Sequence, residues 1–322
     1  QSPNPGSVFN DLTGVAAIAP DNIWAVGGFS NTVSDSRFVA GGALVEHWNG
    51  KQWSVVQNAP RLDSVYLQGI TALSANDIWA VGSNGFSTFT EHWNGTKWGV
   101  VPGPNTGEST NTLMGVKVLS ANDVWAAGFA EGHTTSSGHS QVVQRTLTEH
   151  WDGTKWSIVP GPNSSCVQCM LYGMTALSQN DVWAVGISLD ISTDTGKALL
   201  EHWDGTHWNV ISSPDAGASN VLMQVTAISA NNVWAVGYSY ATKKDWSDGV
   251  ARTLTEHWDG TKWSVIASPN PKPMSNEIAS PGHEAQDMND MWAVAGVPGS
   301  NQVWAVGSQT GATSLSFIER FS

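Results

Sequence analysis

The chain has 322 residues, and charged residues make up 13% of it, about half the share in an average globular protein. Its formal net charge is −13 with only 14 Lys and Arg, so it lacks the basic surface that binds nucleic acid or an anionic membrane. Its apolar runs are much shorter than the roughly 20 residues of a membrane-spanning helix, which argues against membrane insertion. A hydrophobic content of 40%, including 18 Trp, excludes a disordered chain.

Tryptophan phrases recur along the chain and define an internal repeat. The first phrase is Trp-Ala-Val-Gly, or Trp-Ala-Ala-Gly in one copy, and its six copies begin at Trp24, Trp79, Trp125, Trp183, Trp234 and Trp304. The second phrase is Glu-His-Trp followed by Asp or Asn and Gly, with its Trp at Trp48, Trp93, Trp151, Trp203 and Trp258 and a degenerate sixth copy, Glu319-Arg320-Phe321. A further Trp follows five residues later, at Trp53, Trp98, Trp156, Trp208 and Trp263, so only Trp246 and Trp292 lie outside the pattern.

Each repeat predicts four short strands, which we call A to D in chain order. In the third repeat they are residues 115–120, 124–128, 146–151 and 155–159. Asn122 and Asp123 predict a turn between A and B, and Asp152-Gly153 predicts a tight hairpin between C and D. The run Pro160-Gly161-Pro162 then ends the sheet, because proline cannot donate a ladder hydrogen bond.

Six such units predict an all-β fold, a six-bladed β-propeller of four-stranded antiparallel blades that forms one domain over residues 1–322. The expected blades are residues 9–58, 66–104, 112–162, 170–213, 221–269 and 288–322. The sixth blade lacks a recognisable strand D. It is therefore expected either to stay three-stranded, with an open edge that could pair with another chain, or to be closed by a strand upstream of Gln1.

The Trp-x-Val strand, as in Val233-Trp234-Ala235-Val236, resembles that of tectonin-type propellers, and the repeat from about residue 9 onward is similar to bacterial kelch-like and WD40-like propellers of secreted proteins. The chain lacks the kelch double glycine and the Trp-Asp ending of WD40 blades. Tectonin and fucose-lectin relatives bind sugars, so the resemblance implies a secreted, lectin-like protein. It assigns no sugar site to particular residues of this chain.

The connections between strands differ in how much they vary. The C–D hairpin keeps one length, whereas the B–C connection varies in length. It is short in the second repeat, between Gly82 and Glu91, and long in the third, between Gly128 and Glu149. The D–A connection before the sixth repeat is also extended. Because antiparallel strands alternate in direction, B–C and D–A connections share one face of the ring. We expect that variable face to bind a partner, since scaffolds place function on variable loops.

Candidate ligand-binding residues come from these variable connections. Trp246 is an aromatic side chain flanked by Asp245 and Asp248 and preceded by Tyr240, a combination suited to stacking on a sugar and bonding its hydroxyls. The other candidates are His133 and His139 in the third repeat and His283 and Glu284 in the long D–A connection. Their spacing matches no close-set ligand pair, so no metal and no cofactor are expected.

Residues that recur in every repeat are expected to be structural. The Glu149-His150 pair and its copies could suggest metal or acid–base chemistry, but strand parity points the two side chains to opposite faces. The repeated Trp, including Trp125, Trp151 and Trp156, are expected to pack the core, although one sugar pocket per blade would show the same recurrence. Cys166 and Cys169 are expected to form a disulfide, and no catalytic residue is assigned.

The leading function is therefore a non-catalytic binding protein that is extracellular or on the cell surface and recognises a glycan or surface polymer. One alternative is a structural or adhesion subunit that self-associates through the open blade edge. A second is a glycan-cleaving hydrolase or lyase with carboxylates from several blades at the axis.

Overall fold

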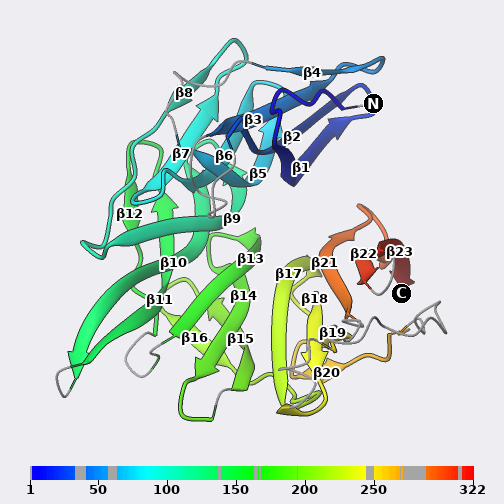
Figure 1. The fold of residues 1–322 in the computed structure, drawn as a ribbon. Helices are drawn as coiled ribbons and strands as arrows, with labels where there is room; N and C mark the ends of the chain where they lie inside the picture. The colour runs from blue at the N-terminus through cyan, green and yellow to red at the C-terminus, as the bar shows by residue number, and fades with distance from the viewer. Residues whose placement is uncertain are drawn as a thin grey trace, which may run out of the picture. The chain divides into compact units, whose positions relative to one another are not determined.

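The structure is a computed structural model that describes residues 2–32, 41–56, 64–136, 139–162, 166, 168–193, 195–243, 250–268, 270, 288–310 and 314–322. The chain divides into two compact units, Gln1–Asn163 and Ser164–Ser322, and each is considered by itself. Every element with assigned bounds in the described residues is a β-strand, β1 to β23 (Figure 1). None of the described segments is a helix long and apolar enough to span a membrane.

The first unit holds twelve strands among its described residues. They are β1 (Phe9–Ala19), β2 (Asn22–Ser30), β3 (Gly41–Trp48), β4 (Trp53–Val55), β5 (Tyr66–Ser74), β6 (Asp77–Ser83), β7 (Thr88–Trp93), β8 (Trp98–Val100), β9 (Thr110–Ser120), β10 (Asp123–Ser136), β11 (His139–Trp151) and β12 (Trp156–Ile158).

The second unit holds eleven strands among its described residues. They are β13 (Gln168–Ser178), β14 (Asp181–Asp190), β15 (Thr195–Trp203), β16 (Trp208–Ile211), β17 (Ser219–Ser229), β18 (Asn232–Tyr240), β19 (Arg252–Trp258), β20 (Trp263–Val265), β21 (Met288–Gly296), β22 (Val303–Thr310) and β23 (Ser314–Phe321).

The strands pair as antiparallel meanders in chain order, as the repeat predicts. The orders β1-β2-β3-β4, β5-β6-β7-β8 and β17-β18-β19-β20 form four-stranded sheets, and β21-β22-β23 forms a three-stranded one. Strands β9 to β12 and β13 to β16 pair in the same successive way. The all-β, propeller-like arrangement is thus confirmed, and the described part of the last repeat is three-stranded.

The third repeat differs from the prediction in its long B–C connection. Residues expected in a loop continue strands B and C, and the pairing of β10 with β11 runs from Val124↔Trp151 out to Ser136↔His139. The insertion is therefore a two-stranded ribbon. Its backbone groups pair with each other, which lets an insertion leave the sheet without unpaired donors.

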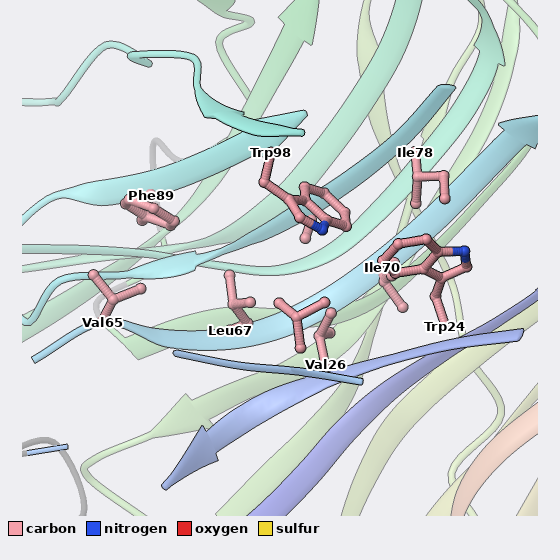
Figure 2. Close-up of a cluster of buried hydrophobic side chains, with 10 residues drawn as sticks. Trp24, Val26, Val65, Leu67, Ile70, Ile78, Phe89 and Trp98 are labelled. Carbon is pink, nitrogen blue, oxygen red and sulfur yellow. The ribbon is translucent and has the colours of Figure 1, made fainter. Parts of the chain in front are cut away.

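Tryptophans of strand B join successive sheets within each unit. Trp24 of the first sheet contacts Trp93 and Trp98 of the second, with ring centroids 5.0 and 5.7 Å apart. Figure 2 shows Trp24 and Val26 lying with Trp98 in this cluster of buried side chains. Strands β6, β14 and β18 are apolar on both faces because both faces are covered, as expected for stacked sheets.

The inner strands also approach closely, and glycine permits it. Each strand A except that of the sixth repeat and β17 has Gly after its bulge, as at Gly69 of β5. A Cβ on Gly69 would lie 2.8 Å from the carbonyl oxygen of Met114 on β9, closer than real side chains come. Glycine is therefore required here by the distance between neighbouring strands.

The C–D hairpins are fastened to the A–B turns beside them. The hairpin glycine has φ between 85° and 94° in all five copies. A Cβ on Gly153 would lie 2.5 Å from Oδ1 of Asn122 in the A–B turn. Asp152 fixes the same hairpin, since its Oδ1 accepts hydrogen bonds from the backbone of Thr154 and Lys155 at 2.8 and 2.9 Å. This edge of each sheet is thus filled by contacts within the repeat.

The substitution Gly153→Ala should destabilise the protein by more than about 1 kcal/mol, because φ is positive and the new Cβ meets Asn122. The measurement is urea unfolding followed by circular dichroism. The matched control is Gly99→Ala on β8, where a Cβ meets no atom within 4 Å, and it should change stability by less than about 0.5 kcal/mol. Equal effects of the two substitutions would contradict the turn-to-turn contact.

Candidate functional site

The innermost strand of each described repeat carries a bulge at one fixed position. The register of strand A with strand B skips one residue there: Thr13, Gln68, Met114, Tyr172, Met223 and Trp292. A bulge leaves its residue out of the ladder and redirects the side chain, and bulges are common beside functional sites. The Trp-Ala-Val-Gly phrase of strand B is repeated almost unchanged, whereas this bulge position holds a different kind of side chain in almost every repeat.

In the second unit, two of these positions belong to an aromatic cluster, which we define as Tyr172, Tyr238, Tyr240 and Trp292 together with Asp290 and Ser308. The Tyr238 ring lies 5.8 Å from Tyr240 and 6.5 Å from Trp292, measured between centroids. Tyr238 and Tyr240 lie two residues apart on β18 and so share a face of that strand. Asp290 and Trp292 on β21 are brought together by Ser308, whose hydroxyl contacts both side chains. Strand β18 packs against β21.

A hydrogen-bond chain anchors the polar side of the cluster. The Ser308 hydroxyl donates to Oδ1 of Asp290 at 2.6 Å, and the indole N–H of Trp292 lies 3.4 Å from the same hydroxyl oxygen. Asp290 is 3% exposed, whereas Trp292 is 48% exposed. The cluster therefore combines a half-exposed indole with a buried carboxylate, and both contact the same serine hydroxyl.

The phenols of the cluster are held in their protonated form. Burial raises the pKa of Tyr172 to about 12, and the Tyr172 hydroxyl lies partly buried 3.6 Å from the sulfur of Met170. Burial also raises the pKa of Tyr238, with smaller contributions from Tyr240, Tyr172 and the negative charge of Asp290. The pKa of Tyr240 is raised by burial and by Asp290. At neutral pH all three hydroxyls can donate hydrogen bonds and none is a base.

The structure places only part of the predicted binding set. Tyr240 is a member of the aromatic cluster. Trp246, Asp245 and Asp248 lie outside the described residues, as do His283 and Glu284. In sequence, the group around Trp246 follows β18, and His283 and Glu284 precede β21. These two strands carry most of the cluster.

His133 and His139 lie at different register positions of one paired ribbon. Both lie on the β10–β11 ribbon, where His133 pairs with Val142 and His139 pairs with Ser136. The His133 side chain is exposed. Over the described ranges, no group of three or more His, Cys, Asp or Glu side chains is arranged to hold a metal ion.

Cys166 and Cys169 form the predicted disulfide, with their Cα atoms 5.9 Å apart. Cys169 is the second residue of β13 and is buried opposite Ser188 of β14. The bridge thus ties the preceding connection to the strand that carries Tyr172.

The repeated Glu-His pairs split between two structural tasks. His150 faces Trp125 with ring centroids 4.5 Å apart, and its Nε2 lies 2.9 Å from Oδ1 of Asp123 at the start of strand B. Four further copies repeat both contacts: His47 with Asn22, His92 with Asp77, His202 with Asp181 and His257 with Asn232. Each histidine therefore fixes its own A–B turn.

Glu46 and Glu256 of these pairs are buried, and each accepts a hydrogen bond from a serine that precedes a proline. The Ser213 hydroxyl donates to Glu256 at 2.8 Å, and the Ser268 hydroxyl donates to Glu319 at the same distance. Ser2 contacts both oxygens of Glu46 at 2.7 and 2.9 Å. The Glu and His side chains serve different neighbours, so the expectation that they do not share one ion is consistent with these contacts.

Glu149 lacks such a serine, because Gly103 occupies the corresponding position before the proline. Neither of its carboxylate oxygens accepts a hydrogen bond of regular geometry from the described residues, and the nearby Thr88 hydroxyl offsets burial only in part. Burial consequently raises the pKa of Glu149 to about 8. Glu256, which has its serine, has a pKa of about 7 for the same main reason.

Sequence reasoning missed Trp292, Tyr172, Tyr238 and Asp290 as members of one site. Trp292 stood out as a tryptophan outside the repeated phrases, and three of the four Tyr fall in the later repeats. That imbalance was the available signal. Which of these side chains meet depends on the bulges and on how adjacent sheets pack.

Comparisons with known proteins support the fold. No protein-family model matches the chain, and no curated protein matches it. A Dyadobacter fermentans protein of unknown function is 10% identical with a TM-score of 0.54, covering 95% of this chain and 92% of its own. A polysaccharide lyase of family PL25, an ulvan lyase, is 11% identical with a TM-score of 0.53, covering 92% and 78%.

A GH74 xyloglucanase from Xanthomonas campestris is 14% identical with a TM-score of 0.53, covering 95% of this chain but only 44% of that enzyme. At such low identity these likenesses support the β-propeller fold and nothing finer. They connect the chain to no tectonin, kelch or WD40 family.

The isosteric change Glu149→Gln should alter how stability depends on pH. The folded-state pKa of Glu149 lies above the unfolded value of 4.5, so the folded chain binds an extra proton between pH 4.5 and about 8. That contribution to stability is present at low pH and is lost as pH rises through this window. Glu149→Gln should therefore be more stable than wild type at pH 8 to 9 and lose this advantage towards pH 4.5.

Thermal unfolding at each pH measures the difference between the two proteins. Gly103→Ser provides a second variant. It offers Glu149 a hydroxyl like the one that Ser213 donates to Glu256, and it should also improve stability at high pH. A difference between wild type and Glu149→Gln that stays constant from pH 4.5 to 9 would contradict this account.

Proposed function

We propose that this protein is an extracellular, non-catalytic propeller that binds a glycan or surface polymer through the aromatic cluster and the variable connections next to it. The observation that carries the proposal is Trp292, which is 48% exposed beside Tyr238 and above the Asp290–Ser308 pair. Pyranose rings stack their C–H faces on indole, and their hydroxyls pair with nearby phenols and hydroxyls. Large well-formed aromatic sites with a few converging polar groups are typical of small-ligand binding.

The chemistry of the site supports binding more than catalysis. Glycan hydrolysis uses two carboxyl groups about 5–10 Å apart, and Asp290 is the single carboxylate among the described members of the cluster. The phenols remain protonated, so they suit hydrogen bonding to ligand hydroxyls.

The glycan ligand class has separate support. The solved structures similar to this chain include an ulvan lyase and a xyloglucanase, proteins that act on polysaccharides. The disulfide is consistent with an extracellular location.

Trp292→Ala should weaken binding to a retained polysaccharide by about tenfold or more, because it removes the stacking surface. Tyr240→Ala should weaken binding less, since that side chain is more enclosed. Affinity gel electrophoresis with a panel of soluble plant, algal and bacterial polysaccharides measures the effect. Phe86→Ala is the matched control, because Phe86 is an aromatic side chain that is 75% exposed and belongs to the first unit.

Binding that is unchanged in Trp292→Ala would exclude the cluster as the site. A panel in which no polysaccharide retards wild-type protein would exclude the glycan-binding function itself.

We also propose that the six repeats close into one six-bladed ring. Within the units, Trp24, Trp79, Trp183 and Trp234 each contact aromatic rings of the following sheet. Trp304 and Val306 on β22 of the sixth repeat are each 42% exposed, and Ile318, which pairs with Val306 on β23, is 66% exposed. An apolar face of this kind needs a cover.

A closed ring predicts a monomer of 34.2 kDa at all concentrations in sedimentation analysis, and a lower melting temperature for Trp304→Ala. Concentration-dependent association, weakened by Trp304→Ala, would instead favour a subunit that assembles through the face of its last blade.

A further inference from the structure

The charge distribution of the aromatic cluster limits the kinds of sugar that it can bind. This inference rests on the proposed glycan-binding function. We propose that the cluster binds uncharged carbohydrate and discriminates against sugars that carry carboxylate or sulfate groups. Three observations support this proposal. They are the position of Asp290, the kinds of hydrogen-bonding groups around it, and the exposure of the described cations that are nearest in sequence.

Asp290 places a negative charge inside the site. Its carboxyl group is 3% exposed on β21, two residues before the stacking side chain Trp292. Its field reaches the hydroxyls of Tyr238 and Tyr240, whose pKa values it helps to raise. A ligand that approaches those hydroxyls therefore approaches the same charge, in surroundings where water screens it poorly.

The groups that surround Asp290 leave its charge in place. Ser308 donates a neutral hydroxyl to it, and the phenols of Tyr238 and Tyr240, on whose pKa it acts, are uncharged at neutral pH. Over the described residues, the ion pairs join histidines to Asp77, Asp123 and Asp181, and none involves Asp290.

The described cations that are nearest to Tyr240 in sequence are exposed to solvent. Lys243 lies three residues beyond the end of β18 and is exposed, and Arg252 begins β19 and is exposed. Recognition of a carboxylate or sulfate ordinarily uses Arg or Lys in direct, often bidentate contact. Phenol, hydroxyl and indole groups instead match the donors and acceptors of sugar hydroxyls. Since like charges placed together at an interface oppose binding, a uronate or sulfate ester at this site is disfavoured.

The test uses the neutral polysaccharide that binds wild type most tightly in the panel and two derivatives of that polymer. One derivative is carboxymethylated and the other is hydroxyethylated to the same degree, so the two differ in charge at similar substituent size. Isothermal titration calorimetry at low salt should show about tenfold or weaker binding of the carboxymethyl form relative to the hydroxyethyl form.

Asp290→Asn should reduce that ratio, because it removes the charge and keeps an acceptor for Ser308. The matched control is Asp11→Asn: Asp11 occupies the corresponding position of β1, accepts a hydrogen bond from Tyr66 at 2.7 Å, and lies in the other unit. It should leave the ratio unchanged. If Asp290→Asn does not fold, the two derivatives and wild type decide the proposal alone.

Equal binding of the two derivatives, or a panel in which charged polysaccharides are the ones bound, would overturn the discrimination and leave glycan binding intact. A panel without any bound polysaccharide would overturn the glycan-binding function and this inference with it.

Discussion

Packing of indole rings between successive sheets is the interaction on which the described structure depends. In each unit, a strand B tryptophan rests against two aromatic rings of the following sheet, as Trp79 does against Trp151 and Trp156. Such side chains bury large apolar areas, and tilted or edge-on pairs add to that stabilisation. The degenerate sixth copy keeps the interaction in reduced form, because Phe321 stacks on Trp234 at 5.3 Å.

The polar residues of the repeat make this packing specific. A histidine covers one side of the strand B indole and bonds to the residue that begins the strand, as His202 does with Asp181. A buried glutamate on the opposite face reaches a serine that follows another strand D, as Glu256 reaches Ser213. Buried polar groups are costly unless paired, so these bonds favour one register between sheets. Burial raises the pKa of both Glu149 and Glu256, to about 8 and about 7.

The candidate site is formed where the repeat departs from its own pattern. Bulge positions are inside every strand A, but in the second unit they hold Tyr172 and Trp292, and the neighbouring strand β18 adds Tyr238 and Tyr240. The repeated strands therefore form a uniform scaffold, and the aromatic side chains of the candidate site occupy a few positions of the second unit. Constant hairpins such as Asp152-Gly153 are occupied by contacts within their own sheet, which leaves the other connections free to differ between repeats.

The sequence determined the elements and their order, because strand periodicity, Asp-Gly turns and proline stops are local properties. It predicted strand D of the third repeat to within a residue at each end, and it predicted the disulfide, whereas β10 and β11 extend well beyond the predicted strands B and C. It did not reveal that the insertion holding His133 is a paired ribbon, since cross-strand pairing has no short-range signature.

The aromatic cluster was decided by tertiary structure alone. Tyr172, Tyr238 and Asp290 are far apart in the chain, and the packing of adjacent sheets brings Tyr172 and Asp290 near enough to raise the pKa of Tyr238. A repeat specifies how each sheet folds. The distance between residues of different sheets is set only when the tryptophans pack.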